Sequence, residues 1–328
     1  MIEILSTGPL CSVQDLGRRG YRQIGVSVSG AMDMLALQVA NVMVRNEAGA
    51  AGLEVTVFPF RARFHARTLV AVTGAGCLAS VGERAMPPWW CIEVQPGDVL
   101  TLKPSGTGAR AYVAIAGGID VPEVLHSRST DIKVGFGGFD GRCVRKGDML
   151  SVGAIAAVGA KPTRGFGVRP PDTELALTEW QNASRGRAVT HVRVLRGPDY
   201  DAFRDDALAD FWGSAWKVTP DSNRIGYRLR GPEIRLREPL DLLSHGIVPG
   251  VVQIPPAGQP IVMMSDAQTS GGYPIVGTVI EADMWRLAQT PIGAEVVFHE
   301  IDVGHAVAAC DAVAAWVARI GRARWTAL

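Results

Sequence analysis

Glycine and proline divide this chain into short segments, and this punctuation restricts its fold more than any other feature. The 328 residues include 38 glycines and 20 prolines, and both residue types favour turns over the interiors of helices and strands. The apolar runs between these turns are short, which is typical of many short strands rather than of βαβ units. The chain is therefore predicted to be mainly β with some helix.

The apolar runs locate most of the expected elements. Strands are predicted at residues 68–73, 91–94, 99–102, 110–116, 191–195, 216–219, 226–229, 233–236, 251–254, 261–264 and 295–301. Helices are predicted at residues 29–45, 199–212, 282–288 and 305–320. The Pro/Gly-rich connection 103–108 suits a hairpin between two of these strands. In the first helix, Ser29 is expected to cap the N-terminus, with Leu35, Val39 and Met43 spaced along one face.

Chain length predicts two domains, because 47% hydrophobic residues in 328 positions exceed what one core usually holds. Periodicity is lost between residues 158 and 187, so the linker is expected there. This places an N-terminal β-rich domain at 1–165, a C-terminal domain at 186–303 and a terminal helix at 304–328.

Charge and composition narrow the class of partner. The formal net charge is +1, which gives no general attraction to nucleic acid or membranes. The N-terminus lacks the basic and apolar regions of a signal peptide, so a cytoplasmic protein is expected. Five scattered cysteines without Cys-x-x-Cys spacing predict reduced side chains, and six histidines without ligand spacing predict no metal site.

Common catalytic motifs are missing from the sequence. It contains neither a P-loop for ATP nor a Gly-x-Ser-x-Gly elbow. The glycines at 135–141 resemble a dinucleotide loop, but a polar segment rather than a helix follows them, so we interpret them as a turn.

The segment 246–274 has the pattern of a binding site, because polar residues directly follow two strand-like runs. Its candidate residues are Asp266, Thr269, Gly271, Gly272 and Tyr273, preceded by Gln253. The glycines allow a close approach of the backbone to a ligand, and the two hydroxyls can donate to a carbonyl or carboxylate. Asp266 is either a general base or a turn cap.

Three further polar clusters leave alternatives open. Gln14, Asp15 and Arg18 lie in a Gly-bounded loop where the arginine can hold a carboxylate, or where Asp15 and Arg18 pair with each other. The serines and threonine of 127–131 suit an anion, or close turns. Asn223 and Tyr227 accompany two arginines, Arg224 and Arg228, on one side of a likely strand, which suits an acidic ligand. Surface pairing would explain only one of these arginines.

Motifs along most of the chain resemble one known family. They are residues 7–18, 29–33, 116–122, 127–130, 137–142, 223–229, 253–255 and 266–274. In this order they resemble the KipA-type proteins, also described as 5-oxoprolinase C subunits, allophanate hydrolase subunit 2-like or biotin-dependent carboxyltransferase family proteins. Between Ser244 and Gly246 the family pattern leads us to expect an acidic residue, where this chain has His245.

The resemblance implies two domains built on β-barrels, at least the C-terminal one cyclophilin-like, and a KipI-type partner. It implies one component of an ATP-dependent 5-oxoprolinase, which converts 5-oxoproline to L-glutamate together with its A and B subunits, the latter of KipI type. The alternatives are a carboxyltransferase acting on urea or a related amide, and a regulator that sequesters a KipI-type kinase inhibitor. The sequence lacks a biotin attachment motif and an ATP motif, so ATP or carboxybiotin is expected only at the level of a complex.

These arguments assign roles to specific residues. The expected catalytic residues are Asp266, Tyr273 and Thr269. The expected substrate-binding residues are Gln14, Asp15, Arg18, Asn223, Arg224, Gln253, Gly271 and Gly272. The isolated chain is expected to have little activity.

Overall fold

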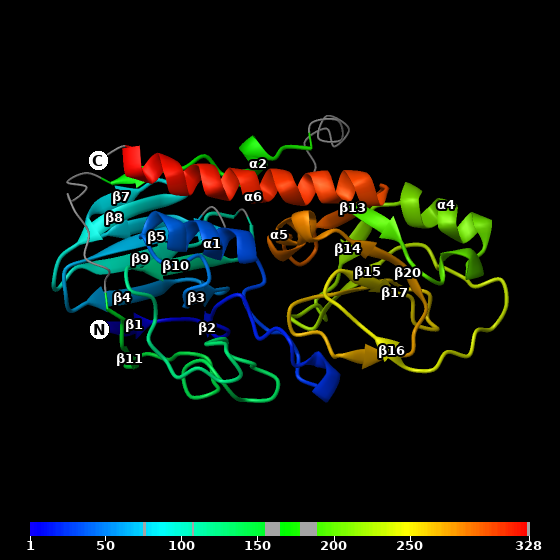
Figure 1. Cartoon of the computed structure of the whole chain (residues 1–328), viewed down its shortest axis with the longest axis horizontal. Coiled ribbons are helices and arrows are strands. Elements are labelled where there is room, and N and C mark those ends of the chain that lie inside the picture. The colour runs from blue at the N-terminus through cyan, green and yellow to red at the C-terminus, as the bar shows by residue number, and fades with distance from the viewer. Residues whose placement is uncertain (75–76, 107, 155–164, 178–188, 327–328) are drawn as a thin grey trace. The chain divides into compact units, whose positions relative to one another are not determined.

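The computed structural model describes residues 1–74, 77–106, 108–154, 165–177 and 189–326 (Figure 1). The chain forms two compact units. Unit 1 comprises Met1–Arg18, Ser29–Glu174 and Ala314–Leu328, and unit 2 comprises Arg19–Val28 and Leu175–Val313. Most of the linker predicted at 158–187 lies outside the described residues. Its described part, 165–177, contains the short strand β12 (Phe166–Gly167) and the short helix α2 (Pro171–Glu174).

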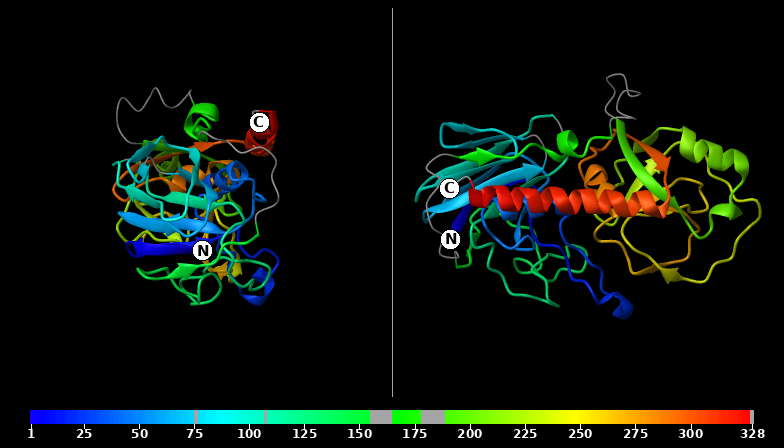
Figure 2. Two further views of the ribbon diagram at one scale, coloured as in Figure 1. Left: turned by 90° about the vertical axis from the view of Figure 1, so that its left-hand side faces the viewer. Right: turned by 45° about the horizontal axis from the view of Figure 1, so that its top comes forward.

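Unit 1 is built from two antiparallel six-stranded sheets, whose strands can be followed in the further views of Figure 2. The first sheet has the order β11 (Met149–Leu150), β1 (Ile2–Ser6), β4 (Phe60–Phe64), β9 (Val99–Lys103), β6 (Leu78–Val81) and β7 (Arg84–Met86). The second has the order β12 (Phe166–Gly167), β8 (Trp90–Val94), β5 (Thr68–Gly74), β10 (Ala111–Ile115), β3 (Gly52–Val55) and β2 (Ser12–Gln14).

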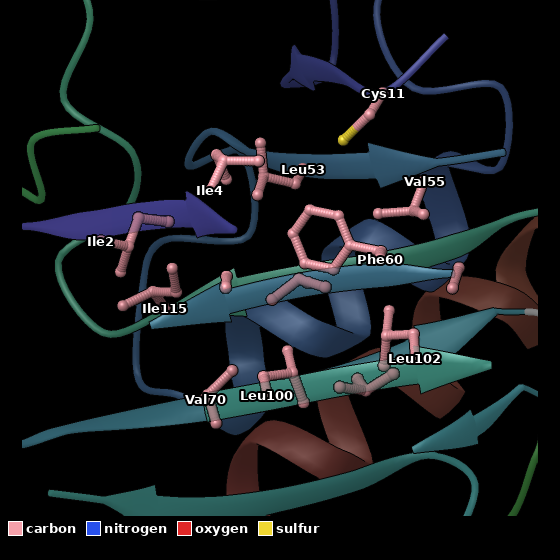
Figure 3. Packing of buried hydrophobic residues seen from close by; sticks show 14 of the residues in the cluster. Ile2, Ile4, Cys11, Leu53, Val55, Phe60, Val70, Leu100, Leu102 and Ile115 are labelled. Atoms are coloured by element: carbon pink, nitrogen blue, oxygen red, sulfur yellow. The ribbon is translucent and has the colours of Figure 1, made fainter. Parts of the chain in front are cut away.

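The core of unit 1 is one apolar cluster to which both sheets contribute (Figure 3). Ile2 and Phe60 come from the first sheet, and Leu53, Val70 and Ile115 come from the second. All five are fully or almost fully buried. The alternation of side chains along the strands places one face of each strand except β12 in this core.

The hairpin predicted across residues 103–108 is wrong. β9 pairs with β4 and β6, whereas β10 pairs with β3 and β5 in the other sheet. Every residue of β10 is buried, because this strand also contacts helix α1 (Met34–Met43). A local turn signal cannot distinguish a hairpin from a crossing between sheets.

Helix α1 is shorter than predicted. It begins after Asp33, whose Oδ1 accepts a 2.8 Å hydrogen bond from the Ala36 N–H. Ser29, the predicted cap, has a φ of 54° and lies before the helix. Asp33 is therefore the N-cap, a role for which a carboxylate is well suited because it faces the positive end of the helix.

Unit 2 contains a closed seven-stranded barrel, which confirms a mainly β fold with a barrel in the C-terminal half. The order is β13 (Val189–Arg196), β20 (Ile275–Val279), β17 (Val251–Gln253), β18 (Ile261–Met263), β15 (Gly226–Arg230), β14 (Trp216–Val218) and β21 (Glu295–Glu300). β13 and β21 pair in parallel and the other neighbours are antiparallel. A separate ribbon joins β16 (His245–Gly246) and β19 (Ser270–Gly271).

Short helices accompany the barrel. The helix predicted at 199–212 is two elements, a 3₁₀ turn at Tyr200–Ala202 and helix α4 at Asp205–Gly213. Phe211 of α4 stacks on Phe298 of β21 with ring centroids 4.8 Å apart. The strand predicted at 233–236 is wrong, since this segment makes only an isolated bridge between Phe203 and Leu236. Helix α5 (Met284–Ala288) confirms the predicted short helix.

The terminal helix α6 (Val303–Thr326) contributes to both units. In unit 2, Ala306 and Ala309 pack in a cluster with Ile280 and Ala282. In unit 1, Trp316 contacts Trp89, with ring centroids 6.2 Å apart. An 18-residue window within Val303–Ala323 has a mean hydropathy of 1.3, so this helix is long and apolar enough to cross a membrane by length and composition alone.

Candidate functional site

The segment that follows β18 carries five of the eleven predicted site residues and returns to the barrel as β20. β15 and β18 are antiparallel neighbours, with Gly226 opposite Met263. Continuing this register beyond both strand ends brings residue 224 next to residues 265 and 266. The barrel therefore joins two groups of predicted site residues that lie about 40 positions apart.

Arg224 and Asp266 form a buried bidentate ion pair. Nε of Arg224 lies 2.8 Å from Oδ2 of Asp266, and Nη2 lies 2.9 Å from Oδ1. The Asp266 N–H also donates to the Arg224 carbonyl oxygen at 2.8 Å. The residues are 9% and 4% exposed. The pair fixes the turn after β18 to the turn before β15.

Asn223 closes the turn that leads into β15. Its Oδ1 accepts a 2.8 Å hydrogen bond from the Ile225 N–H and a 3.4 Å bond from the Gly226 N–H. An asparagine that bonds the backbone two residues ahead is an ordinary turn former. This geometry gives Asn223 a local structural part, and its predicted contact with substrate stays a prediction.

The ribbon has an inner and an outer face. Burial alternates along both of its segments: Ile247 and Ala267 are buried, His245, Thr269 and Gly271 are partly exposed, and the residues between them are exposed. This is the period of two expected for strands. The inner face is continuous with a small apolar core of Ile247, Val251, Met263, Ala267 and Ile275.

Gly271 allows the ribbon to lie close to the barrel. A Cβ atom at this position would lie 2.4 Å from Cδ1 of Ile247 and 3.1 Å from Nε2 of Gln253. Gln253, at the end of β17, is 1% exposed, and its Nε2 donates to the Tyr273 carbonyl at the long distance of 3.5 Å. The structure therefore brings Gln253, Thr269 and Gly271 together, as predicted for one site.

Gly272 and Tyr273 lie at the open end of the ribbon. Gly272 is exposed, and a Cβ there would lie 3.4 Å from the Leu242 carbonyl oxygen. Tyr273 is 45% exposed. Its hydroxyl is thus placed on the side of the ribbon that solvent or another molecule can reach.

His245 is the residue at this site to which sequence reasoning gave no role. It lies directly opposite Gly271 in the ribbon. Its Nδ1 is 3.4 Å from the Leu243 carbonyl oxygen, and its Nε2 is buried without a hydrogen-bond partner among the described residues. The only signal in the sequence was the histidine where the family pattern suggested an acid.

The other predicted site residues, Gln14, Asp15 and Arg18, belong to unit 1 and meet the 127–130 segment. We call the set Gln14, Asp15, Arg18, Ser127, Ser129 and Thr130 the serine cluster. Gln14 Nε2 donates to Ser12 Oγ at 2.9 Å and to the Thr130 carbonyl at 3.1 Å. Arg18 Nη2 donates to the Ser129 carbonyl at 2.5 Å, and its guanidinium lies 4.5 Å from the centroid of the Phe136 ring.

Asp15 organises the serine cluster. Its Oδ1 accepts hydrogen bonds from the Ser127 hydroxyl at 2.8 Å, from the Gly17 N–H at 2.7 Å and from the Ser129 hydroxyl. Its Oδ2 accepts from the Arg128 N–H at 2.5 Å. These donors tie the loop after β2 to a segment more than a hundred residues away. Asp15 is thus used as an internal anchor.

Two further histidines meet on the barrel, which sequence spacing did not indicate. His191 Nδ1 and His299 Nε2 are 2.8 Å apart across the β13–β21 pairing. Burial and the neighbouring His191 lower the pKa of His299 from 6.5 to about 4. Among the described residues, no group of three or more His, Cys, Asp or Glu side chains could hold a metal ion.

Comparison with known proteins places the chain in a family. Residues 24–300 match the model of the carboxyltransferase domain, subdomain A and B. The chain belongs to this carboxyltransferase domain family. The match covers the whole barrel, the ribbon and most of the two sheets of unit 1.

Two relatives that are similar over nearly their full length carry the same description. The 5-oxoprolinase C subunit of Escherichia coli K12 is 42% identical over 314 residues, 94% of each chain. The protein of the same description from Haemophilus influenzae is 33% identical over 306 residues, 93% of each chain.

A solved structure shows the same fold within a larger enzyme. The urea carboxylase of Kluyveromyces lactis is similar over 97% of this chain, with a TM-score of 0.86 and 29% identity. The similarity covers 29% of that enzyme's chain, so this chain corresponds to one part of it.

Proposed function

We propose that this chain is the C subunit of an ATP-dependent 5-oxoprolinase, acting in the cytoplasm with the A and B subunits, the latter of KipI type. The observation that carries this proposal is similarity over nearly the whole of both chains to two 5-oxoprolinase C subunits, one of them at 42% identity. ATP is used at the level of the complex, because this sequence has no P-loop.

The ribbon suits a small cyclic amide. Thr269 and Tyr273 supply hydroxyls and Gln253 supplies an amide N–H, all of which can polarise a carbonyl oxygen in a partly water-excluded site. Asp266 is held by Arg224, so we assign this pair to shaping the site rather than to abstracting a proton. Chemistry that needs a free base is then supplied by another residue or another protein of the complex, which agrees with little activity for the chain alone.

Exposed apolar side chains beside the ribbon support a partner protein at this site. Leu243 is 92% exposed, and Leu240, Val248 and Tyr273 are 40% to 48% exposed. All four lie on the segments that enter and leave the ribbon. Large exposed apolar residues that gather near a site mark interaction surfaces more often than inert surface. We assign them to contact with the KipI-type protein.

The carboxyltransferase alternative is favoured by the family model and by the structural similarity to urea carboxylase. It needs carboxybiotin delivered on a carrier. It uses the same ribbon, because urea also presents a carbonyl flanked by N–H groups.

The deciding experiment reconstitutes the chain with its candidate partners and measures ATP-dependent formation of glutamate from 5-oxoproline. We expect turnover only with the complete set. If the set instead carboxylates urea in the presence of a biotinylated carrier and leaves 5-oxoproline unchanged, the alternative is correct.

The partner surface has its own test. Leu243→Ser should weaken co-purification with the KipI-type protein by about tenfold or more. The matched control is Ile292→Ser, since Ile292 is 59% exposed on the turn before β21 and lies outside the ribbon segments.

A further inference from the structure

The inner face of the ribbon presents one hydrogen-bond acceptor that the protein itself does not use. His245 Nε2 is buried and has no partner among the residues that the structure describes. Its other nitrogen, Nδ1, faces the Leu243 carbonyl oxygen at 3.4 Å. A carbonyl can only accept, so this contact requires the proton on Nδ1 and leaves the lone pair on Nε2.

Strand pairing places His245 on the same face of the ribbon as Gly271 and Thr269. Directly opposed residues of an antiparallel pair project to the same face, so His245 shares a face with Gly271, its partner in the ribbon. The position of a Cβ at Gly271 would be 3.1 Å from Gln253 Nε2. Thr269, two residues earlier, lies on the same face by alternation, and the Ile247 N–H bonds its carbonyl at 3.0 Å.

The face is closed at one end and open at the other. Ile247 is fully buried and Ala267 is 5% exposed, whereas Tyr273 beyond Gly271 is 45% exposed. The Tyr273 end of the ribbon is thus the end nearer to solvent, and Ile247 and Ala267 belong to the apolar core at the other end. A buried acceptor without a partner is unfavourable unless a ligand or water satisfies it.

We propose that this face recognises a cis amide, with His245 Nε2 accepting the ligand's N–H while Thr269 Oγ1 and Gln253 Nε2 donate to its carbonyl oxygen. A lactam or a urea presents its N–H and carbonyl on one edge, whereas a trans peptide presents them on opposite edges. His245 is then the residue that distinguishes an amide from an ester. The choice of a lactam as ligand rests on the proposed 5-oxoprolinase function.

The test compares 5-oxoproline with its ring-oxygen analogue, 5-oxotetrahydrofuran-2-carboxylate, which replaces the N–H by oxygen at equal ring size. Binding of both is measured by calorimetry on the full chain together with its co-purified partner proteins. We expect the wild-type protein to bind the lactam at least about tenfold more tightly than the lactone, since the lactone leaves Nε2 unsatisfied and opposes it with a second lone pair.

Two substitutions separate the nitrogens of His245. His245→Asn keeps a donor near the Nδ1 position but does not reach the Nε2 position. The ratio of the affinity for the lactam to the affinity for the lactone should therefore fall to about one. His245→Gln reaches the Nε2 position with an oxygen that can accept, so it should keep part of the preference. Thermal unfolding of each variant confirms that the fold is intact.

The outcomes separate this inference from the proposed function. Equal binding of lactam and lactone by the wild-type protein, or an unchanged preference in His245→Asn, overturns the inference even if the complex converts 5-oxoproline. A lactam preference that His245→Asn abolishes, in a complex that does not turn over 5-oxoproline, supports the inference and rejects the function.

Discussion

The serine cluster of unit 1 and the ribbon of unit 2 give the same signal in the sequence and have different structures. Both combine glycines with hydroxyl, amide and carboxylate side chains near strand ends. In the serine cluster, Asp15 accepts four hydrogen bonds from its own chain. On the ribbon, His245 Nε2 makes none with the described residues, and Gln253 makes one long bond.

This difference shows that a polar side chain is available to a ligand only when other groups of the protein do not already occupy its hydrogen-bonding atoms. Gly138 shows how tightly the cluster is filled: a Cβ there would lie 1.9 Å from Thr130 Oγ1. The ribbon instead ends in the exposed residues Gly272 and Tyr273. We therefore assign Asp15 to stability and the ribbon to binding, although Gln14 Oε1 of the cluster, like His245 Nε2, is buried without a hydrogen-bond partner among the described residues.

The largest effect on stability is expected for Asp15→Ala. It leaves two hydroxyls and two backbone N–H groups without their acceptor in a buried site, so it should lower the free energy of unfolding by about 3–5 kcal/mol. Urea denaturation of the full chain measures this. Asp140→Asn is the control, because the Asp140 side chain is 76% exposed and 4.0 Å from Arg142, and asparagine tolerates the left-handed backbone at this position, where φ is 54°. A loss below about 1 kcal/mol, together with weaker ligand binding, would move the serine cluster into the binding site and break the comparison.

The next largest effect concerns the ion pair below the ribbon. Asp266→Asn and Arg224→Met should each destabilise the protein by about 3 kcal/mol, because each leaves one buried partner uncompensated. The double variant should lose less than the sum of the two. If Asp266→Asn leaves unfolding unchanged but abolishes turnover in the complex, Asp266 is a catalytic base and the assignment of the pair to structure is wrong.

These two sites also show how far sequence reasoning reaches. Strands such as β5 and β10 were predicted nearly to the residue, because an apolar run between turns is a local property. The pairing of Arg224 with Asp266 was not predicted, since it depends on the register of β15 and β18 across 42 positions. The predicted hairpin failed for the same reason: sequence located both strands but not their partners.

The candidate site was predicted in part. Gln253, Thr269 and Gly271 follow strand-like runs, and the ribbon brings them together. His245 lies outside those runs, and its role depends on which of its two nitrogens the backbone engages, a fact that only three-dimensional structure provides. The part of Asp15 as an anchor likewise depends on donors from residues 127–129, which lie more than a hundred positions away in the sequence.

Acidification should lower the free energy of unfolding by a smaller amount. The pH range over which this loss occurs should differ between the two units. The pKa of His299 is lowered from 6.5 to about 4. Between these two pH values the His299 side chain binds a proton in the unfolded state but not in the native state. Stability should thus fall between pH 6.5 and about 4, by on the order of 1 kcal/mol because the pair is only partly buried. His299→Gln should flatten this decline.

In unit 1, the hydrogen bond from Arg142 lowers the pKa of Asp148 below its ordinary value of 3.8. The stabilisation that ionised Asp148 gives the native state is therefore fully present above pH 3.8. It is lost only as the pH falls further. If the free energy of unfolding declines between pH 6.5 and about 4 by the same amount in His299→Gln as in wild type, the two units do not differ in their pH dependence. Unfolding curves at half-unit steps of pH provide the measurement.

The smallest effect on stability, and the sharpest test of the comparison, is expected on the ribbon itself. Thr269→Val and Tyr273→Phe remove only hydroxyls from partly exposed positions, so each should change the free energy of unfolding by less than about 0.5 kcal/mol. In the reconstituted complex each should lower kcat/KM by about ten- to a hundredfold, because the hydroxyl's bond to the carbonyl strengthens as charge develops on the oxygen. Ser270→Ala, on the outer face, should change neither quantity. Destabilisation without a specific loss of activity would give the ribbon the same structural role as the serine cluster, and the contrast between the two regions would then be one of exposure alone.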